Sequence, residues 1–135
     1  MKINKPLYYI LNITWGLPLT IVGALVALGL LIIGRKPHHH GGCLYFNIGE
    51  CWGGINLGLI FLTDKIDSDS VKNHEYGHSL QNAAFGPLMI PLIAIPSAIR
   101  YWIQKYRKAN GLKRVDYDAI WFEGQATYLG NHTIE

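Results

Sequence analysis

The chain has 135 residues, a formal net charge of +3 and a hydrophobic content of 50%. This length predicts a single domain. Its lysines and arginines form no unbroken run, so the charge does not indicate a nucleic-acid-binding protein. The hydrophobic residues are unevenly distributed, and the first long apolar segment lies near the N-terminus.

Residues 7–33 contain no charged side chain and are flanked by lysines before and by Arg35 and Lys36 after. A helix over this segment exceeds the roughly 20 residues that cross a bilayer. A cleaved signal peptide fits less well, because the apolar run is long and no small-x-small cleavage site closes it. We therefore predict an N-terminal transmembrane helix, with residues 1–36 as a membrane anchor.

The orientation of this helix stays open, because the charges on its two sides nearly balance. A basic cluster between residues 100 and 114 favours a cytoplasmic location for the rest of the chain. Cys43 and Cys51 do not decide the compartment. They can be free thiols in a reducing compartment or a disulfide in an oxidising one.

Residues 37–42 read Pro-His-His-His-Gly-Gly and are expected to form a flexible joint. Adjacent side chains rarely converge on one ion, so we favour a loop over a metal site at the three histidines. The next segments, 43–48 and 55–61, alternate apolar and polar residues, with turn glycines between them. This pattern predicts a β-hairpin. Its edge can pair with an extended peptide substrate, or the hairpin can simply cover a helix.

Residues 73–81 contain the pattern His74-Glu75-x-x-His78. On a helix, residues four apart share one face, so the two imidazoles can point at a common ion and supply half of a tetrahedral zinc site. Glu75 follows about 100° further round the helix, beside the metal. There it can accept a proton from a water molecule whose pKa the metal lowers. The alternative is a helix that carries two surface histidines.

The ends of this helix are marked in the sequence. Ser68, Asp69 and Ser70 are candidate N-caps, and Gly86-Pro87 is expected to end the helix. An apolar segment interrupted by prolines follows, and residues 101–108 are basic and aromatic. A segment of this kind is too short and too broken for a comfortable span. We expect residues 86–103 to re-enter or lie at the membrane, with the basic end at anionic headgroups. The alternative is a kinked second span that residues 101–103 extend.

Residues 115–130 predict a final helix, with Asp116 or Asp118 as its cap and Gly130 at its end. Glu123 lies beside the apolar stripe of this helix, where a carboxylate is costly unless it is paired or bound to a metal. Two histidines and one glutamate form a known catalytic zinc set with an open fourth position. We predict Glu123 as the third ligand, with Asp118 and His132 as alternatives.

The motif at 74–78, followed on a later helix by Trp-Phe-Glu-Gly-Gln-Ala at 121–126, resembles the gluzincin class of zinc metallopeptidases. More narrowly, residues 74–81, 86–88, 95–97 and 123–126 resemble a group of small bacterial membrane proteins described as peptidases, over about the last half of the chain. The resemblance implies Zn²⁺ held by His74, His78 and Glu123, with Glu75 as the base, in a bacterial cell membrane.

This chain departs from the pattern at one position. Many gluzincins carry an aspartate four residues after the ligand glutamate, where it orients a ligand histidine, and here that residue is Thr127. The donor that would stabilise a developing oxyanion is not evident from the sequence. The candidates are Tyr76, Tyr117, Tyr128 and His132.

We therefore predict a mainly α protein with a small β-hairpin, a minimal zincin-like α+β fold, in which residues 37–135 form the metal-binding domain. The predicted function is a membrane-anchored zinc peptidase that acts on a peptide or protein and contacts membrane lipid. The alternative is a non-catalytic membrane protein with a structural zinc closed by a fourth ligand, Cys43, Cys51 or His132, and a hairpin that binds a partner. So small a chain can also require an oligomer to shield its site.

Overall fold

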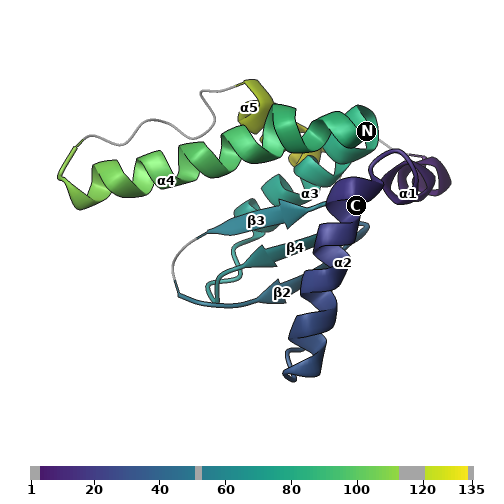
Figure 1. Ribbon diagram of the computed structural model, residues 1–135, viewed down its shortest axis with the longest axis horizontal. Helices are drawn as coiled ribbons and strands as arrows, with labels where there is room; N and C mark the ends of the chain where they lie inside the picture. Colours follow the sequence, from purple (N-terminus) through teal and green to yellow (C-terminus); the bar gives the residue numbers. More distant parts are fainter. Residues whose placement is uncertain (1–3, 51–52, 113–120, 134–135) are drawn as a thin grey trace.

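The computed structural model describes residues 4–50, 53–112 and 121–133 (Figure 1). The chain is mainly helical, with a small mixed sheet, so the predicted α+β class is confirmed. The elements in chain order are α1 (Lys5–Ile13), α2 (Leu17–Ile32), β1 (His38–His40), β2 (Cys43–Asn47), β3 (Gly54–Leu57), β4 (Ile60–Thr63), α3 (Asp69–Phe85), the 3₁₀ turn η1 (Gly86–Leu88), the π-helical turn η2 (Ile90–Ala94), α4 (Ile95–Ala109) and α5 (Trp121–Thr133).

The sheet has the strand order β1-β2-β4-β3, and this differs from the predicted hairpin. Gly58 adopts a left-handed φ of 77° and turns the chain inside the segment 55–61, which therefore divides between β3 and β4. Strand β4 then runs parallel to β2, with Phe46 opposite Leu62. The expectation of a flexible joint at residues 37–42 was also wrong, because His38–His40 pairs with β2 as an edge strand.

Helices cover both faces of the sheet. On one face, Phe46, Ile60 and Leu62 pack against Ala27 of α2 and its apolar neighbours. On the other face, a second buried cluster joins strands β2 and β4 to α1 and α3. Its members are Tyr8, Cys43, Tyr45, Phe61, Tyr76 and Ala83. The sheet is therefore the middle layer of the molecule, and α3 lies with one side on the sheet.

The segment predicted as one transmembrane helix contains two helices, α1 and α2, which meet at an angle of 85°. Asn12 and Asn82 supply a physical reason for the break. The Asn82 amide donates to the side-chain oxygen of Asn12, at 2.6 Å, and to the backbone carbonyl of Gly16, at 3.0 Å. These bonds hold the Asn82 amide against the bend, and a side chain at Gly16 would overlap that amide, so the two helices meet around a buried polar contact.

Within the described ranges, no single helix combines the length and apolar character needed to cross a bilayer. Two pairs of helices, each bent sharply at a short break, have this length and apolar character when both helices of the pair are taken together. The first is α1 with α2, and the second joins residues 69–88 to residues 90–109 at an angle of 118°. The second bend follows the predicted helix stop, because α3 ends at Phe85 and Gly86 adopts a left-handed φ of 59°.

Helix α5 packs against α3 at very short range. A methyl group at Gly77 would overlap the Ala126 carbonyl, and one at Gly130 would overlap the Asn73 carbonyl. The predicted end of the last helix at Gly130 was therefore wrong: α5 continues to Thr133, and Gly130 is a point of contact between helices. The predicted caps Asp116 and Asp118 lie outside the described residues.

The substitution Gly77→Ala tests this close approach. The added methyl group would force α5 away from α3, and overpacking of this kind costs about 1–3 kcal/mol of unfolding free energy. Gly29→Ala is the matched control, since Gly29 lies in α2 with open space around it and alanine is the better helix former. Thermal unfolding followed by tryptophan fluorescence should show a lower unfolding midpoint for Gly77→Ala and no decrease for Gly29→Ala. Equal midpoints for the two variants would contradict the packing.

Candidate metal centre

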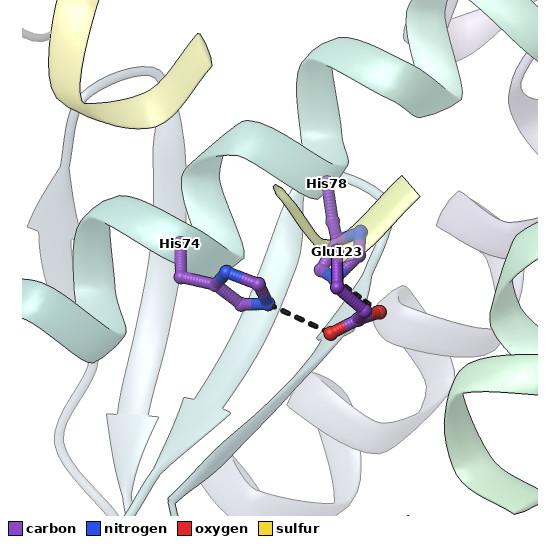
Figure 2. Close-up of side chains that lie close together, drawn as sticks. All are labelled: His74, His78 and Glu123. Atoms are coloured by element: carbon purple, nitrogen blue, oxygen red, sulfur yellow. Dashed lines mark hydrogen bonds and ion pairs between the residues drawn. The ribbon is translucent and has the colours of Figure 1, made fainter. Parts of the chain in front are cut away.

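The side chains of His74, His78 and Glu123 converge between α3 and α5 (Figure 2). Nε2 of His74 lies 3.1 Å from Oε2 of Glu123, and Nε2 of His78 lies 3.4 Å from Oε1 of the same carboxylate. One ligand atom from each residue lies within 4.8 Å of the other two, which is the spacing of a group that could hold a metal ion. The three residues predicted as ligands from the sequence are therefore brought together.

Glu75 lies at the edge of this group. Its Oε1 is 4.0 Å from Nε2 of His74, and its side chain is buried. Burial raises the pKa of Glu75, against the opposing charges of His78 and His74. The carboxylate thus lies beside the convergence point without occupying it, as predicted from its position one step round the helix.

The amide of Gln81 fixes the orientation of His78. Nε2 of Gln81 donates to the backbone carbonyl of Phe122, at 2.8 Å, and to Oε1 of Gln125, at 2.9 Å. This leaves Oε1 of Gln81 as an acceptor, 2.7 Å from Nδ1 of His78. His78 must therefore carry a proton on Nδ1, which frees Nε2 to bind a metal.

Thr127 plays the corresponding part for His74. Its hydroxyl oxygen lies 2.7 Å from Nδ1 of His74, so the imidazole can donate there and turn Nε2 toward Glu123. The sequence comparison with gluzincins had marked this residue as a departure from an aspartate. The structure places the neutral hydroxyl of Thr127 against Nδ1 of His74.

The chemistry of these donors fits a cation. Burial alone would lower the pKa of His78, but its contact with the Glu123 carboxylate and the charge of Glu75 raise it, so a proton or a metal ion is favoured between Nε2 of His78 and the Glu123 carboxylate. Oε1 of Glu123 and Oε2 of Glu75 are both buried and lack a hydrogen-bond donor. Burial alone would raise the pKa of Glu123, but its ion pairs with His74 and His78 lower that pKa to about 2. An ionised carboxylate and two oriented imidazoles are the donor set that zinc accepts.

A cavity of about 290 Å³ opens onto this group, and Glu75 and His78 form part of its wall. The rest of the wall comes from Leu19, from strand β3 and from one side of the segment that contains Met89, η2 and α4. Strand β3 is an edge of the sheet, so the cavity lies between a strand edge and a helix. The sequence had not placed α4 at the site.

Most residues considered as further participants lie elsewhere. Tyr76 is buried in the core against Tyr8, and Tyr128 and His132 stack on each other at a ring distance of 4.0 Å on the exterior. Cys43 is a buried free thiol outside the metal-binding group, and burial raises its pKa to about 11. The remaining candidates, Cys51, Tyr117 and Asp118, lie outside the described residues.

Tyr101 and Ser97 were missed in the sequence, although both line the cavity from α4. They lie four residues apart and so share one side of that helix, which brings two hydroxyl groups to the wall opposite the strand edge. From the aromatic and basic character of residues 101–108 we predicted only a contact with headgroups. The sequence pattern did not indicate that this helix also lines a cavity.

Searches of protein-family models, curated proteins and solved structures each returned no match to this chain. Inferences about its function therefore depend on the site itself and on the surface around it.

The substitution Thr127→Val tests the role of the hydroxyl beside His74. Loss of the group that orients a ligand histidine typically weakens metal binding by about 10- to 100-fold. Thr133→Val is the matched control, because Thr133 lies on the same helix and its hydroxyl donates to the Leu129 carbonyl, away from the metal-binding group. Competition with a fluorescent zinc chelator would measure both. Unchanged affinity in Thr127→Val would show that the threonine does not orient the ligand.

Proposed function

We propose that this chain is a zinc-dependent peptidase. The observation that supports it most directly is the convergence of His74, His78 and Glu123 beside the buried Glu75, at the wall of a cavity. A structural zinc is closed by four protein ligands, whereas a catalytic zinc keeps one position for water or substrate. Within the described residues the metal-binding group has three members, which favours the catalytic arrangement.

Zinc in this site would supply the Lewis acidity that polarises a carbonyl and lowers the pKa of water. Glu75 takes a proton from the attacking water, whose oxygen forms the new bond to the carbonyl carbon. The same carboxyl group then delivers that proton to the nitrogen as the carbon–nitrogen bond breaks, so that an acid and an amine leave. His78 is held in its required tautomer by Gln81 throughout.

Strand β3 is suited to hold the peptide. The Gly53 carbonyl accepts a hydrogen bond from the Asp64 backbone N–H. Because hydrogen-bonded pairs alternate along an antiparallel ladder, the backbone polar groups of residues 53, 55 and 57 face β4. The backbone polar groups of Gly54 and Asn56 therefore point to the outer edge, at the cavity. An extended peptide paired with these two residues would run past Glu75 and His78, which favours the predicted edge-pairing interpretation over a covering role.

We further propose that the protein lies in a membrane through α2 and α4. The sheet-facing side of α2 is built largely from small residues, among them Thr20, Gly23 and Ala27, while Leu25 is 66% exposed on the opposite side. A helix that contacts lipid typically packs small residues against the protein and exposes large apolar side chains on its other side. On α4, exposed apolar residues stand beside a basic end, as in interfacial helices.

Glu75→Gln is the experiment that tests the reaction. The amide cannot accept the proton, so hydrolysis of a peptide library should be lost while zinc binding stays within a few-fold of the unmodified chain. Cleavage would be followed by mass spectrometry and zinc by competition with a chelator. If the variant cleaved as well as the parent, the proposed base would be wrong. If the parent bound zinc and cut nothing, the structural-zinc alternative would replace the peptidase.

Membrane contact is tested by flotation with vesicles of phosphatidylcholine and phosphatidylglycerol. The unmodified chain should float with the vesicles, and a Leu25→Glu, Leu28→Glu variant should float less, since each buried charge costs several kcal/mol in hydrocarbon. Ile66→Glu is the control, because Ile66 is also exposed, at 63%, but precedes α3 and lies away from α2. A parent chain that stayed at the bottom of the gradient without detergent would overturn the proposal.

A further inference from the structure

We propose that the cavity selects a bulky apolar side chain next to the bond that is cleaved. This deepens the proposed peptidase and rests on it, because it names the class of peptide that the same site would take. The inference comes from the wall that faces the β3 edge, which α4 and the η2 turn build with a different chemistry from the strand.

Apart from Ser97 and Tyr101, that wall is built from apolar residues. Met89 and Ile93 are almost fully buried, and they belong to the same cluster as Leu19 and Phe122. Ala98 lies further along, on α4. A charged or amide side chain placed here would lose its hydration and find few partners, which costs several kcal/mol. An aliphatic or aromatic side chain would gain from leaving water.

The apolar wall and the residues proposed for catalysis line the same cavity. Glu75 and His78 line the same cavity as Gly54 and Asn56, and the Asn56 side-chain amide donates to the Glu75 backbone carbonyl at 2.9 Å, so a peptide held at that edge has its bonds within reach of the metal-binding group. Side chains of an extended peptide alternate between its two faces. One of them must then enter the apolar space beneath α4, close to the carbonyl under attack.

The size of the cavity favours a large side chain over a small one. Its volume is about 290 Å³, and a dry apolar cavity of roughly 150 Å³ already accepts benzene. Glycine or alanine would leave most of this volume empty. Leucine or phenylalanine would fill more of it and make the larger number of contacts.

The entrance has the same apolar character. Trp102 and Ile55 also line the cavity, and both are exposed, at 68% and 40%, so they lie where the cavity opens outward. They come from opposite walls, α4 and β3. A side chain that enters between them passes no charged group of the cavity wall until it reaches Glu75 and His78. This favours an unfolded, apolar stretch of polypeptide as the substrate.

Binding of two peptide hydroxamates to the zinc-loaded protein tests the inference without requiring turnover. The hydroxamate group chelates zinc, and the two probes differ only in carrying leucine or glycine at the residue that would enter the cavity. Isothermal titration calorimetry should show that the leucine probe binds about 10- to 100-fold more tightly. A peptide library cut by the same protein should show a preference for large apolar residues at that position.

Ala98→Phe tests whether the cavity itself selects the leucine side chain, as distinct from an overall change in zinc or peptide binding. The phenyl ring would fill the cavity, so the leucine probe should lose most of its advantage while the glycine probe and zinc affinity change little. Ile99→Phe is the control, because Ile99 is the next residue on α4, is exposed and does not line the cavity. It should keep the preference for leucine.

The two proposals fail in different ways. If neither probe bound a zinc-loaded protein, no open metal position would exist, and the peptidase itself would be wrong. If both probes bound equally well, or if Ala98→Phe and Ile99→Phe behaved alike, the metal chemistry would stand and the apolar selection would be overturned.

Discussion

The candidate site depends on how closely two helix backbones approach each other. Glu123 is carried by α5, and the histidines are carried by α3, so the carboxylate reaches both imidazoles only if the helices nearly touch. Gly77 lies between the two histidines and meets the backbone of Ala126. Any side chain at Gly77 would separate the helices and take the carboxylate with it.

The periodicity of α3 and α5 places the residues that pack the two helices together on the same faces as the metal-ligand candidates. On α5, Ala126, Thr127 and Gly130 follow Glu123 by three, four and seven residues, and they therefore share its face. On α3, Gln81 follows His78 by three residues and joins α5 through the Phe122 carbonyl. Small residues allow the approach, and polar residues between them orient the ligands. One helix pair thus carries the packing contacts, the ligands and the groups that hold those ligands in place.

The opposite side of α3 is fixed by the N-terminal helices. The Tyr8 hydroxyl lies 2.6 Å from Oγ of Ser79, and Asn12 donates to the Ser79 carbonyl at 3.3 Å. The Asn82 amide, 2.6 Å from Oδ1 of Asn12, extends this buried network. Such groups are costly when unpaired, so α1 holds a particular register on α3. The N-terminal segment, expected as an anchor, therefore also positions the helix that carries the metal motif.

The parts of this structure that were predictable from sequence are those set by local periodicity. The face shared by His74 and His78 follows from helix geometry alone, and Glu123 was identified because a carboxylate beside an apolar stripe needs a partner. The strand order could not be predicted, because β2 pairs with β4 through contacts between residues distant in sequence. Gly130 was misread for a related reason: a glycine that ends a helix and one that admits a neighbouring backbone look alike in sequence.

Thr127 stands where the resemblance predicts an aspartate, and a neutral hydroxyl holds an imidazole less strongly than a carboxylate does. The structure suggests a reason why the weaker group is tolerated. Glu75 and Glu123 are already two buried carboxylates at one site, and each has an oxygen without a hydrogen-bond donor. A third carboxylate at position 127, which contacts His74, would add like charge where burial is already costly. Threonine orients the ring without that charge, and the remaining negative charge suits a divalent cation.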